Sequence, residues 1–372
     1  MSYRKTAIAA AALSFAALAT LAPTSFASAA DLPVKAKPKV VDLPFFFVID
    51  DRVTYSYIFN ATDPGVFTVR PDGTYNGKTA KSVYSFTHFD AWAYGTNFFT
   101  ISMFKSDHND PAVPCINAGI LNGGAAESCA GATEFYGLIR STFGFNELFN
   151  TKAFTAGPLH NVSFEVGADG ETENNFLGPA KRDFVGGLQF AFDLPYKGYF
   201  DVAPLAYYEF NHNAFNQCGL FAPGVPGLTC NLDGDTNFHT TWALELNYYM
   251  DLGFLPENMQ YFAISGRAGW YGPKGDANGL PFNSGPGVLS TATKTELNSE
   301  PIRLTFDASK AFWGPKYSQF VTTWVAYRYW QNKFGLDHNA ELGVCNTGTA
   351  VAYTSTHSCT EQTVYAGVTV KF

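Results

Sequence analysis

The sequence is short of charged residues and of long apolar runs. Charged side chains make up 15% of the 372 residues, slightly fewer than the aromatic ones at 16%. No stretch after residue 30 is apolar over the about 20 residues that a membrane-spanning helix needs. A bundle of membrane helices is therefore excluded, and the many aromatic residues need another explanation.

Basic residues are also scarce. Residues 1–30 hold two of the 24 Lys and Arg side chains and none of the 32 Asp and Glu, so the remaining chain carries 22 bases against 32 acids, a net charge of −10. Nucleic-acid binders and phosphate-selective pores need basic surface. We therefore expect no nucleic-acid partner and no phosphate-selective pore.

The first 30 residues have the pattern of an export signal. Arg4 and Lys5 precede the apolar run Ala7–Leu21, and Ser28 to Ala30 are small enough for a signal-peptidase site. We predict a signal peptide over residues 1–30 and a Pro- and Lys-rich periplasmic tether over residues 31–50. A retained anchor helix is the alternative, but the apolar run is short for a membrane span.

The last ten residues indicate the class of structure. Val364, Val368 and Phe372 share one apolar face of Thr363–Phe372, and the other face is mixed, which is the period of a strand between two different solvents. A terminal Phe on the apolar face resembles the assembly signal of bacterial outer-membrane barrels, so Phe372 is predicted to have that role. Since only helices and closed barrels satisfy the backbone in lipid, we predict a transmembrane β-barrel over residues 51–372.

The alternation predicts an all-β, antiparallel, up-and-down barrel of about 12 strands in the bacterial outer membrane. Short turns and long polar loops alternate, so the turns are expected in the periplasm and the loops outside. Phe238 and Lys310 are assigned to the lipid-facing sides of their strands, and His239 to a lumen face. The predicted strands are residues 51–60, 82–94, 98–105, 133–143, 160–169, 182–194, 199–211, 238–252, 260–272, 301–312, 319–331 and 363–372.

The six cysteines fall in three polar loops that are predicted to lie outside. Six cysteines allow 15 pairings, but pairing within each loop is favoured, and the oxidising periplasm permits it. Each bridge would stabilise its loop by about 3 kcal/mol. No CxxC or HExxH spacing occurs, and residues 231–235 lack the spacing of a calcium loop, so we expect no metal and no cofactor. The predicted pairs are Cys115 with Cys129, Cys218 with Cys230, and Cys345 with Cys359.

The lumen of such a barrel is expected to be narrow, because eight strands enclose only side chains and sixteen leave an open channel. Inward positions combine rings with acids and arginines. The rings either brace the barrel or form stacking sites for flat solutes, each worth about 1–3 kcal/mol for a base. The predicted substrate path consists of Tyr84, Phe86, His88, Asp90, Trp92, Tyr136, Arg140, Glu165, Glu209, Arg267, Trp324, Arg328 and Trp330.

Three segments and the strand plan resemble a known family. They are DAWAYGTNFF (Asp90–Phe99), FYGLIRSTFGFNEL (Phe135–Leu148) and YRYW (Tyr327–Trp330). Together, over residues 51–372, they resemble Tsx-type nucleoside-specific outer-membrane channels. The resemblance implies a monomeric 12-stranded channel for nucleosides and deoxynucleosides. It puts Asp90, Trp92, Arg328 and Trp330 along the substrate path, whereas the cysteine-bridged outer loops depart from the family pattern.

Other functions stay open. A general or other-solute porin shares most of these features, and a structural barrel that displays disulfide-pinned loops shares many. An outer-membrane phospholipase needs a lipid-facing His beside a Ser; His88 and His239 are predicted to face the lumen, so we expect no enzyme. The expected partners are outer-membrane lipid and lipopolysaccharide, the barrel assembly machinery and a small solute, with a nucleoside first. Balanced lumen charges predict little ion selectivity or a slight cation preference.

Overall fold

The computed structural model describes residues 45–107, 110, 131–174, 180–212, 235–275, 292–339, 344–349 and 352–372. The predicted signal peptide, most of the predicted tether, and Cys115, Cys129, Cys218 and Cys230 lie outside the described residues. Within the described ranges, no helix has the length and apolar character to span a membrane.

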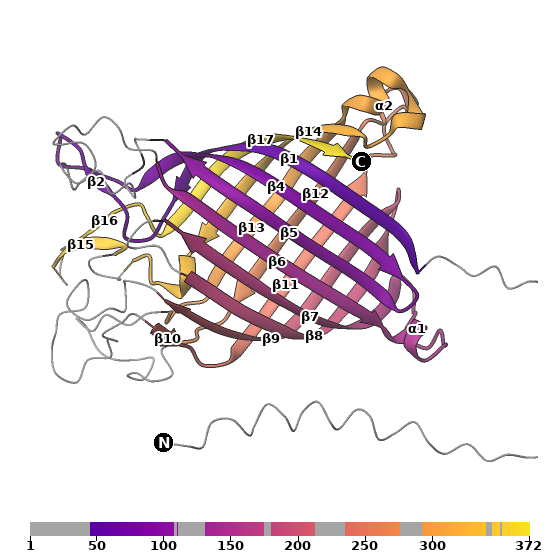
Figure 1. Ribbon diagram of the computed structural model, residues 1–372, viewed down its shortest axis with the longest axis horizontal. Coiled ribbons are helices and arrows are strands. Elements are labelled where there is room, and N and C mark those ends of the chain that lie inside the picture. The colour runs from indigo at the N-terminus through magenta and orange to yellow at the C-terminus, as the bar shows by residue number, and fades with distance from the viewer. Residues whose placement is uncertain are drawn as a thin grey trace, which may run out of the picture. The chain divides into compact units, whose positions relative to one another are not determined.

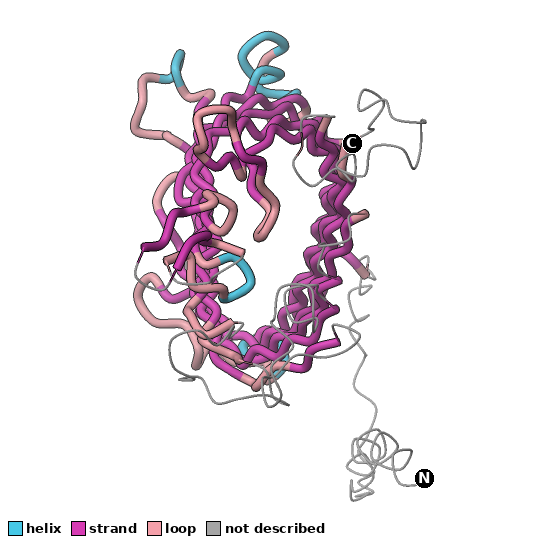
Figure 2. Tube along the Cα trace, turned by 90° about the vertical axis from the view of Figure 1, so that its left-hand side faces the viewer, coloured by secondary structure: helices cyan, strands magenta, loops and turns pink. Residues whose placement is uncertain are grey.

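Twelve long antiparallel strands form a closed barrel (Figures 1 and 2). Each strand pairs with the next long strand along the chain, and the last pairs with the first, with Thr54 opposite Thr369. Closure leaves no unpaired edge. The strands are β1 (Phe46–Thr62), β4 (Lys78–Trp92), β5 (Gly95–Ser106), β6 (Thr133–Gly144), β7 (Leu159–Glu173), β8 (Ala180–Leu194), β9 (Gly198–His212), β11 (Thr241–Asp251), β12 (Phe262–Tyr271), β13 (Glu296–Asp307), β14 (Val321–Gln331) and β17 (Thr360–Lys371).

The two ends of the barrel differ (Figure 1). One, the turn end, carries short connections with α1 (Phe145–Leu148), η4 (Glu257–Met259), α2 (Ala308–Trp313) and η5 (Pro315–Tyr317). The other, the loop end, carries the long connections. The elements there are β2 (Thr68–Val69), β3 (Tyr75–Asn76), β10 (Asp235–Asn237), η6 (Lys333–Gly335), β15 (Asn346–Thr349) and β16 (Ala352–Ser355). The predicted alternation of turns and loops is confirmed.

The outer face of the barrel is an apolar belt. Val53, Ile101 and Ile302 are exposed by 50%, 54% and 52%, although each lies within a long strand. The opposite faces of these strands are buried or half-buried, as at Ser56 on β1 and Ser102 on β5. Such a continuous exposed apolar surface requires lipid rather than water as its solvent.

Two of the strand ends that were predicted wrongly change the place of named residues. The strand predicted from residue 238 begins at Thr241, so Phe238 does not face lipid: its side chain is 2% exposed, and its ring lies 5.0 Å from Lys274 Nζ. His239 precedes the strand and is exposed. The strand predicted to reach residue 312 ends at Asp307, whose carboxylate accepts the Lys310 backbone N–H at 2.9 Å and starts α2.

Lys310 therefore lies on α2 and not on a lipid-facing strand. Its ammonium donates to the Gln260 carbonyl oxygen at 2.6 Å. Asp307 also accepts from Ser318 and from the Gln319 backbone, so one inward carboxylate organises the whole β13–β14 connection. The first strand starts earlier than expected, because β1 begins at Phe46, inside the range assigned to the tether.

The third cysteine pair forms as predicted. Cys345 and Cys359 are bonded, with 5.3 Å between their Cα atoms and a sequence separation of 14. Both are buried in a small apolar cluster with Phe334, Leu336 and Val344 at the loop end. The disulfide thus joins the base of the β15–β16 hairpin to the start of β17 and holds the hairpin against the wall.

Candidate functional site in the barrel lumen

Residues on β4 that were predicted to face the lumen lie on the lipid face. Tyr84 is opposite Tyr55, a lipid-facing residue of β1, and the two ring centroids are 5.3 Å apart. Phe86 lies 6.4 Å from the ring of Phe372. Because cross-strand partners share a face, Tyr84, Phe86, His88, Asp90 and Trp92 all point outward, and the predicted inward face of this strand is wrong.

The polar members of this outward face satisfy one another at the turn end. His88 Nδ1 lies 2.6 Å from Asp51 Oδ1 and its Nε2 lies 3.1 Å from Asp90 Oδ2. Asn97 donates to Asp90 at 2.9 Å and accepts from Ser141 at 2.7 Å. The lumen face of β4 carries Lys81, Val83, Ser85, Thr87 and Phe89 instead.

Arg140 contacts three acidic side chains inside the barrel. Its guanidinium reaches from β6 to Glu245 on β11, with 2.7 Å between Nη2 and Oε1. Its Nη1 donates to Asp169 at 2.5 Å, and Nε lies 3.8 Å from Glu165. Since β7, β8 and β9 separate the two strands in the sheet, this contact crosses the barrel interior. Arg140 is 8% and Glu165 is 3% exposed.

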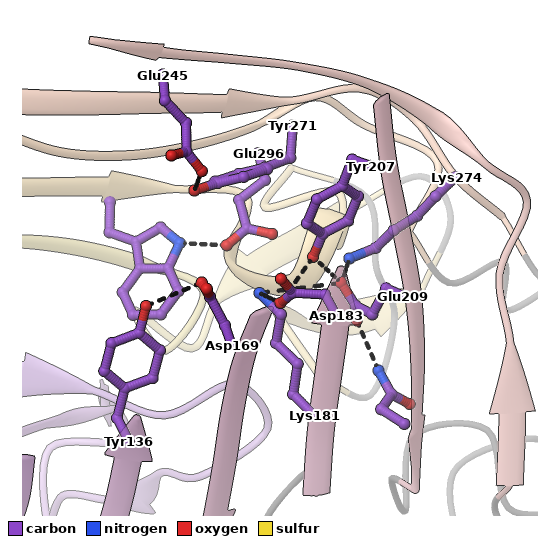
Figure 3. A network of polar contacts seen from close by, with 12 residues as sticks. Tyr136, Asp169, Lys181, Asp183, Tyr207, Glu209, Glu245, Tyr271, Lys274 and Glu296 are labelled. Atoms are coloured by element: carbon purple, nitrogen blue, oxygen red, sulfur yellow. Dashed lines mark hydrogen bonds and ion pairs between the residues drawn. The ribbon is translucent and has the colours of Figure 1, made fainter. Parts of the chain in front are cut away.

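A second polar network lies inside the barrel around β8 and β9 (Figure 3). Glu209 is fully buried and accepts from Lys274, from Tyr207 at 2.5 Å and from Asn211 at 2.8 Å. Lys181 Nζ lies 3.2 Å from Asp183. Buried charges persist only when they are paired and hydrogen-bonded, and here each carboxylate has a cation beside it.

The two tryptophans of β14 face inward as predicted, but their ring faces are occupied. Arg303 lies 3.9 Å above the ring of Trp324, and Lys333 lies 4.2 Å above that of Trp330. Trp330 Nε1 donates to Glu296 at 2.7 Å. The rings are 6% and 8% exposed, so a flat solute would have to displace a cation to stack on them. Arg328 pairs with Glu361 at 2.8 Å in the same region.

Arg267 differs from the other predicted path residues. It faces inward opposite Asn247, and it is exposed. Its guanidinium has no ion pair or hydrogen bond to any residue that the structure describes.

Tyr136 also faces inward, and its hydroxyl donates to Asp169 at 3.0 Å. Nearer the turn end, Arg52 pairs with Asp50 at 2.5 Å while 40% of its side chain stays exposed.

Several lumen residues escaped the sequence analysis because strands were started too late. Lys181 lies directly before the predicted strand 182–194, and Glu361 before 363–372. Extending the alternation by one or two steps would have placed them on inward faces. The missed members of the lumen networks are Lys81, Asp169, Lys181, Asp183, Lys274, Glu296, Glu300, Lys333 and Glu361.

Comparisons with known proteins give structural similarity alone. No protein-family model matches the chain, and no curated protein matches it. Among solved structures, the translocator domain of the autotransporter NalP from Neisseria meningitidis is similar, with 10% identity, 87% of each chain covered and a TM-score of 0.34. The beta domain of the Bordetella autotransporter BrkA covers 87% of this chain and 99% of its own at 7% identity and a TM-score of 0.34.

Acinetobacter baumannii OccAB3 is similar at 10% identity, with 87% of this chain and 99% of its own covered and a TM-score of 0.30.

The class of this protein is identified from its own barrel. Twelve strands of 10 to 17 residues, closed without an edge and apolar outside, define a bacterial outer-membrane β-barrel. The turn end is then the periplasmic end, and the loop end is extracellular.

Proposed function

We propose that this barrel is a narrow channel for passive diffusion of small hydrophilic solutes across the outer membrane. The observation that carries the proposal is Arg267, an exposed cation on an inward face that makes no ion pair or hydrogen bond within the described ranges. An ionised side chain without a direct hydrogen bond or ion pair needs water, so the lumen beside Arg267 is hydrated. A barrel with a dry, packed interior would not retain such a residue.

The cross-lumen contacts set the width of the proposed passage. Arg140 and Glu245 divide the interior where they meet, and Arg303 with Glu300 and Tyr365 narrows it beside β13. A solute must pass beside these ion pairs. We therefore expect a low single-channel conductance, well below that of sixteen-stranded porins with an aqueous channel.

Nucleosides are the solutes that the sequence resemblance puts first. The choice of nucleosides is supported by three inward-facing rings that lie among acids and arginines, namely Tyr136, Trp324 and Trp330. Stacking on the tryptophans requires Arg303 and Lys333 to move aside. Sugars and amino acids require no such step, so a general diffusion porin is the competing proposal for the same lumen.

A barrel with a closed interior is the second candidate. The complete burial of Glu209, Lys274 and Tyr207 favours it, because these side chains exclude water from their part of the lumen. Its function would then lie in the surface that its disulfide-pinned loops display.

We also propose that the protein is not an enzyme. His88 lies on the lipid face, where an outer-membrane phospholipase would need it, but both its ring nitrogens face carboxylates. The nearby Ser141 donates to Asn97 and not to His88. A serine nucleophile needs a base within hydrogen-bond reach. Phospholipid hydrolysis by the purified protein, abolished in His88→Ala, would contradict this.

Conductance of the refolded protein in a planar bilayer tests the proposed channel. Small, reproducible conductance steps support it, whereas a barrel that folds and inserts but does not conduct supports the closed interior. Titration with adenosine or thymidine then tests the solute. Block by nucleosides but not by sugars or amino acids, weakened in Trp330→Ala, supports the nucleoside proposal; indifference to nucleosides supports a general porin.

A further inference from the structure

A cavity of about 250 Å³ lies outside the lumen, on the outer wall at the extracellular end. Its floor includes Tyr329 and Gln331, which alternate with the inward Arg328 and Trp330 along β14 and therefore point outward. Gln362 on β17 is opposite Tyr329 and points the same way. These polar side chains follow directly above the lipid-facing Val325 and Tyr327, so the cavity begins where the apolar belt ends.

The segment pinned by the disulfide forms another part of the lining. Ser355, His357, Cys345 and Cys359 of this segment line the cavity. Gly77 permits this packing, since a Cβ there would lie 2.7 Å from the Thr356 carbonyl oxygen. The close approach brings this segment beside the start of β4 at Lys78, which also lines the cavity.

The cavity has several polar groups free to bind a ligand. Among the described residues, the ammonium of Lys78, the ring of His357, the amide of Gln362 and the hydroxyl of Tyr329 have no hydrogen-bond or ion-pair partner. The ten lining residues include one lysine and two histidines but no carboxylate. In a chain with 32 acids and 24 bases, this composition favours an anion.

We propose that this cavity binds an anionic sugar unit of lipopolysaccharide, a phosphorylated or carboxylated ring at the level of the outer-leaflet headgroups. The free amide, hydroxyl and imidazole hydrogen-bond sugar hydroxyls, and Lys78 donates a charge-assisted bond to the acidic group. The volume is below the about 300–1,000 Å³ of pockets for drug-sized ligands, which suits a single sugar ring, and the polar lining does not suit an acyl chain. The site does not depend on whether the lumen conducts.

Native mass spectrometry of the detergent-solubilised full chain with deep-rough lipopolysaccharide tests the proposal. We expect one bound lipopolysaccharide at low concentration, and binding about tenfold weaker in Lys78→Gln, the loss that one charge-assisted hydrogen bond predicts. His357→Asn is the second variant, because His357 has φ of 60° and Asn tolerates that backbone conformation. It should weaken binding without disturbing the loop.

Lys152→Gln is the matched control, since it removes the same charge from an exposed position beside α1 at the periplasmic end. Heat-modifiable migration in gels verifies that each variant is folded. Equal binding in the wild type, Lys78→Gln and His357→Asn would overturn the proposal. So would displacement by inorganic phosphate as effective as by lipopolysaccharide, or equal binding of anionic phospholipid, because either would show that the sugar is not recognised.

Discussion

Arg140 on β6 and Glu245 on β11 meet across the interior of the barrel, 105 residues apart in the chain, with 2.7 Å and 3.0 Å between their paired nitrogen and oxygen atoms. Tyr271 also donates to Glu245, at 3.1 Å. Three strands lie between the two partners in the sheet, so this ion pair acts as a strut that fixes the width of the lumen.

Replacing Arg140 is expected to destabilise the barrel and widen the lumen. Arg140→Met leaves Glu245, Asp169 and Glu165 without their shared cation, and removing one partner of a buried ion pair costs about 3–5 kcal/mol. Urea unfolding in lipid vesicles, followed by tryptophan fluorescence, measures the loss. The double variant Arg140→Met with Glu245→Gln should recover part of it. Unchanged stability in the single variant would contradict the role of Arg140 as a strut.

His88 is expected to affect stability but not conduction. His88→Leu leaves Asp51 and Asp90 close together on the lipid face without the imidazole between them. The free energy of unfolding should fall by about 1–3 kcal/mol, the cost of unsatisfied polar groups. Because the ring lies outside the barrel, single-channel conductance and any solute block should stay as in the wild type. A changed conductance with unchanged stability would contradict the placement of His88 outside the barrel.

The channel is expected to prefer cations, because inward carboxylates outnumber inward cations in the described ranges. Arg267→Glu should strengthen this preference, and the reversal potential in a salt gradient measures it. Arg70→Glu, on the exposed β2–β3 hairpin, makes the same charge change outside the lumen and should have little effect. The inward carboxylates are Asp50, Glu134, Glu165, Asp169, Glu171, Glu173, Asp183, Asp193, Asp201, Glu209, Glu245, Asp251, Glu296, Glu300, Asp307 and Glu361; the cations are Arg52, Lys81, Arg140, Lys181, Arg267, Lys274, Arg303, Arg328, Lys333 and Lys371.

Anion selectivity of the wild type, or an equal shift in Arg70→Glu, would show that the inward charges do not set the selectivity. In that case the electrostatic potential of the charges on the extracellular loops would control which ions enter.

Breaking the Cys345–Cys359 bond is expected to loosen the extracellular end. A Cys345→Ser and Cys359→Ser variant releases a loop closed over 14 residues, which costs about 3 kcal/mol in the chain-entropy model. Limited proteolysis should then cleave the β15–β16 hairpin while the barrel strands stay protected. Equal protease resistance with and without the bond would show that the apolar cluster around Phe334 and Leu336 holds the hairpin alone.

The strand plan could be predicted because lipid imposes a simple pattern. Alternation of apolar and polar residues, together with alternating turns and loops, gave twelve strands whose centres agree with the structure. β14 was placed with the correct side inward, because Arg328 does not tolerate lipid. The local pairing of Cys345 with Cys359 followed from their position in one polar loop.

The sequence by itself determined that this protein has strands with two unlike faces, how many they are, and which ends carry loops. Only the tertiary structure decided which face of β4 is inside. Both faces of that strand carry rings and polar groups, and a period of two separates faces without orienting them. The register with β1 put His88 beside Asp51 and so satisfied it outside the barrel. Likewise, Arg140 and Glu245 lie too far apart in the chain for any local pattern to pair them; closure of the sheet brings them together.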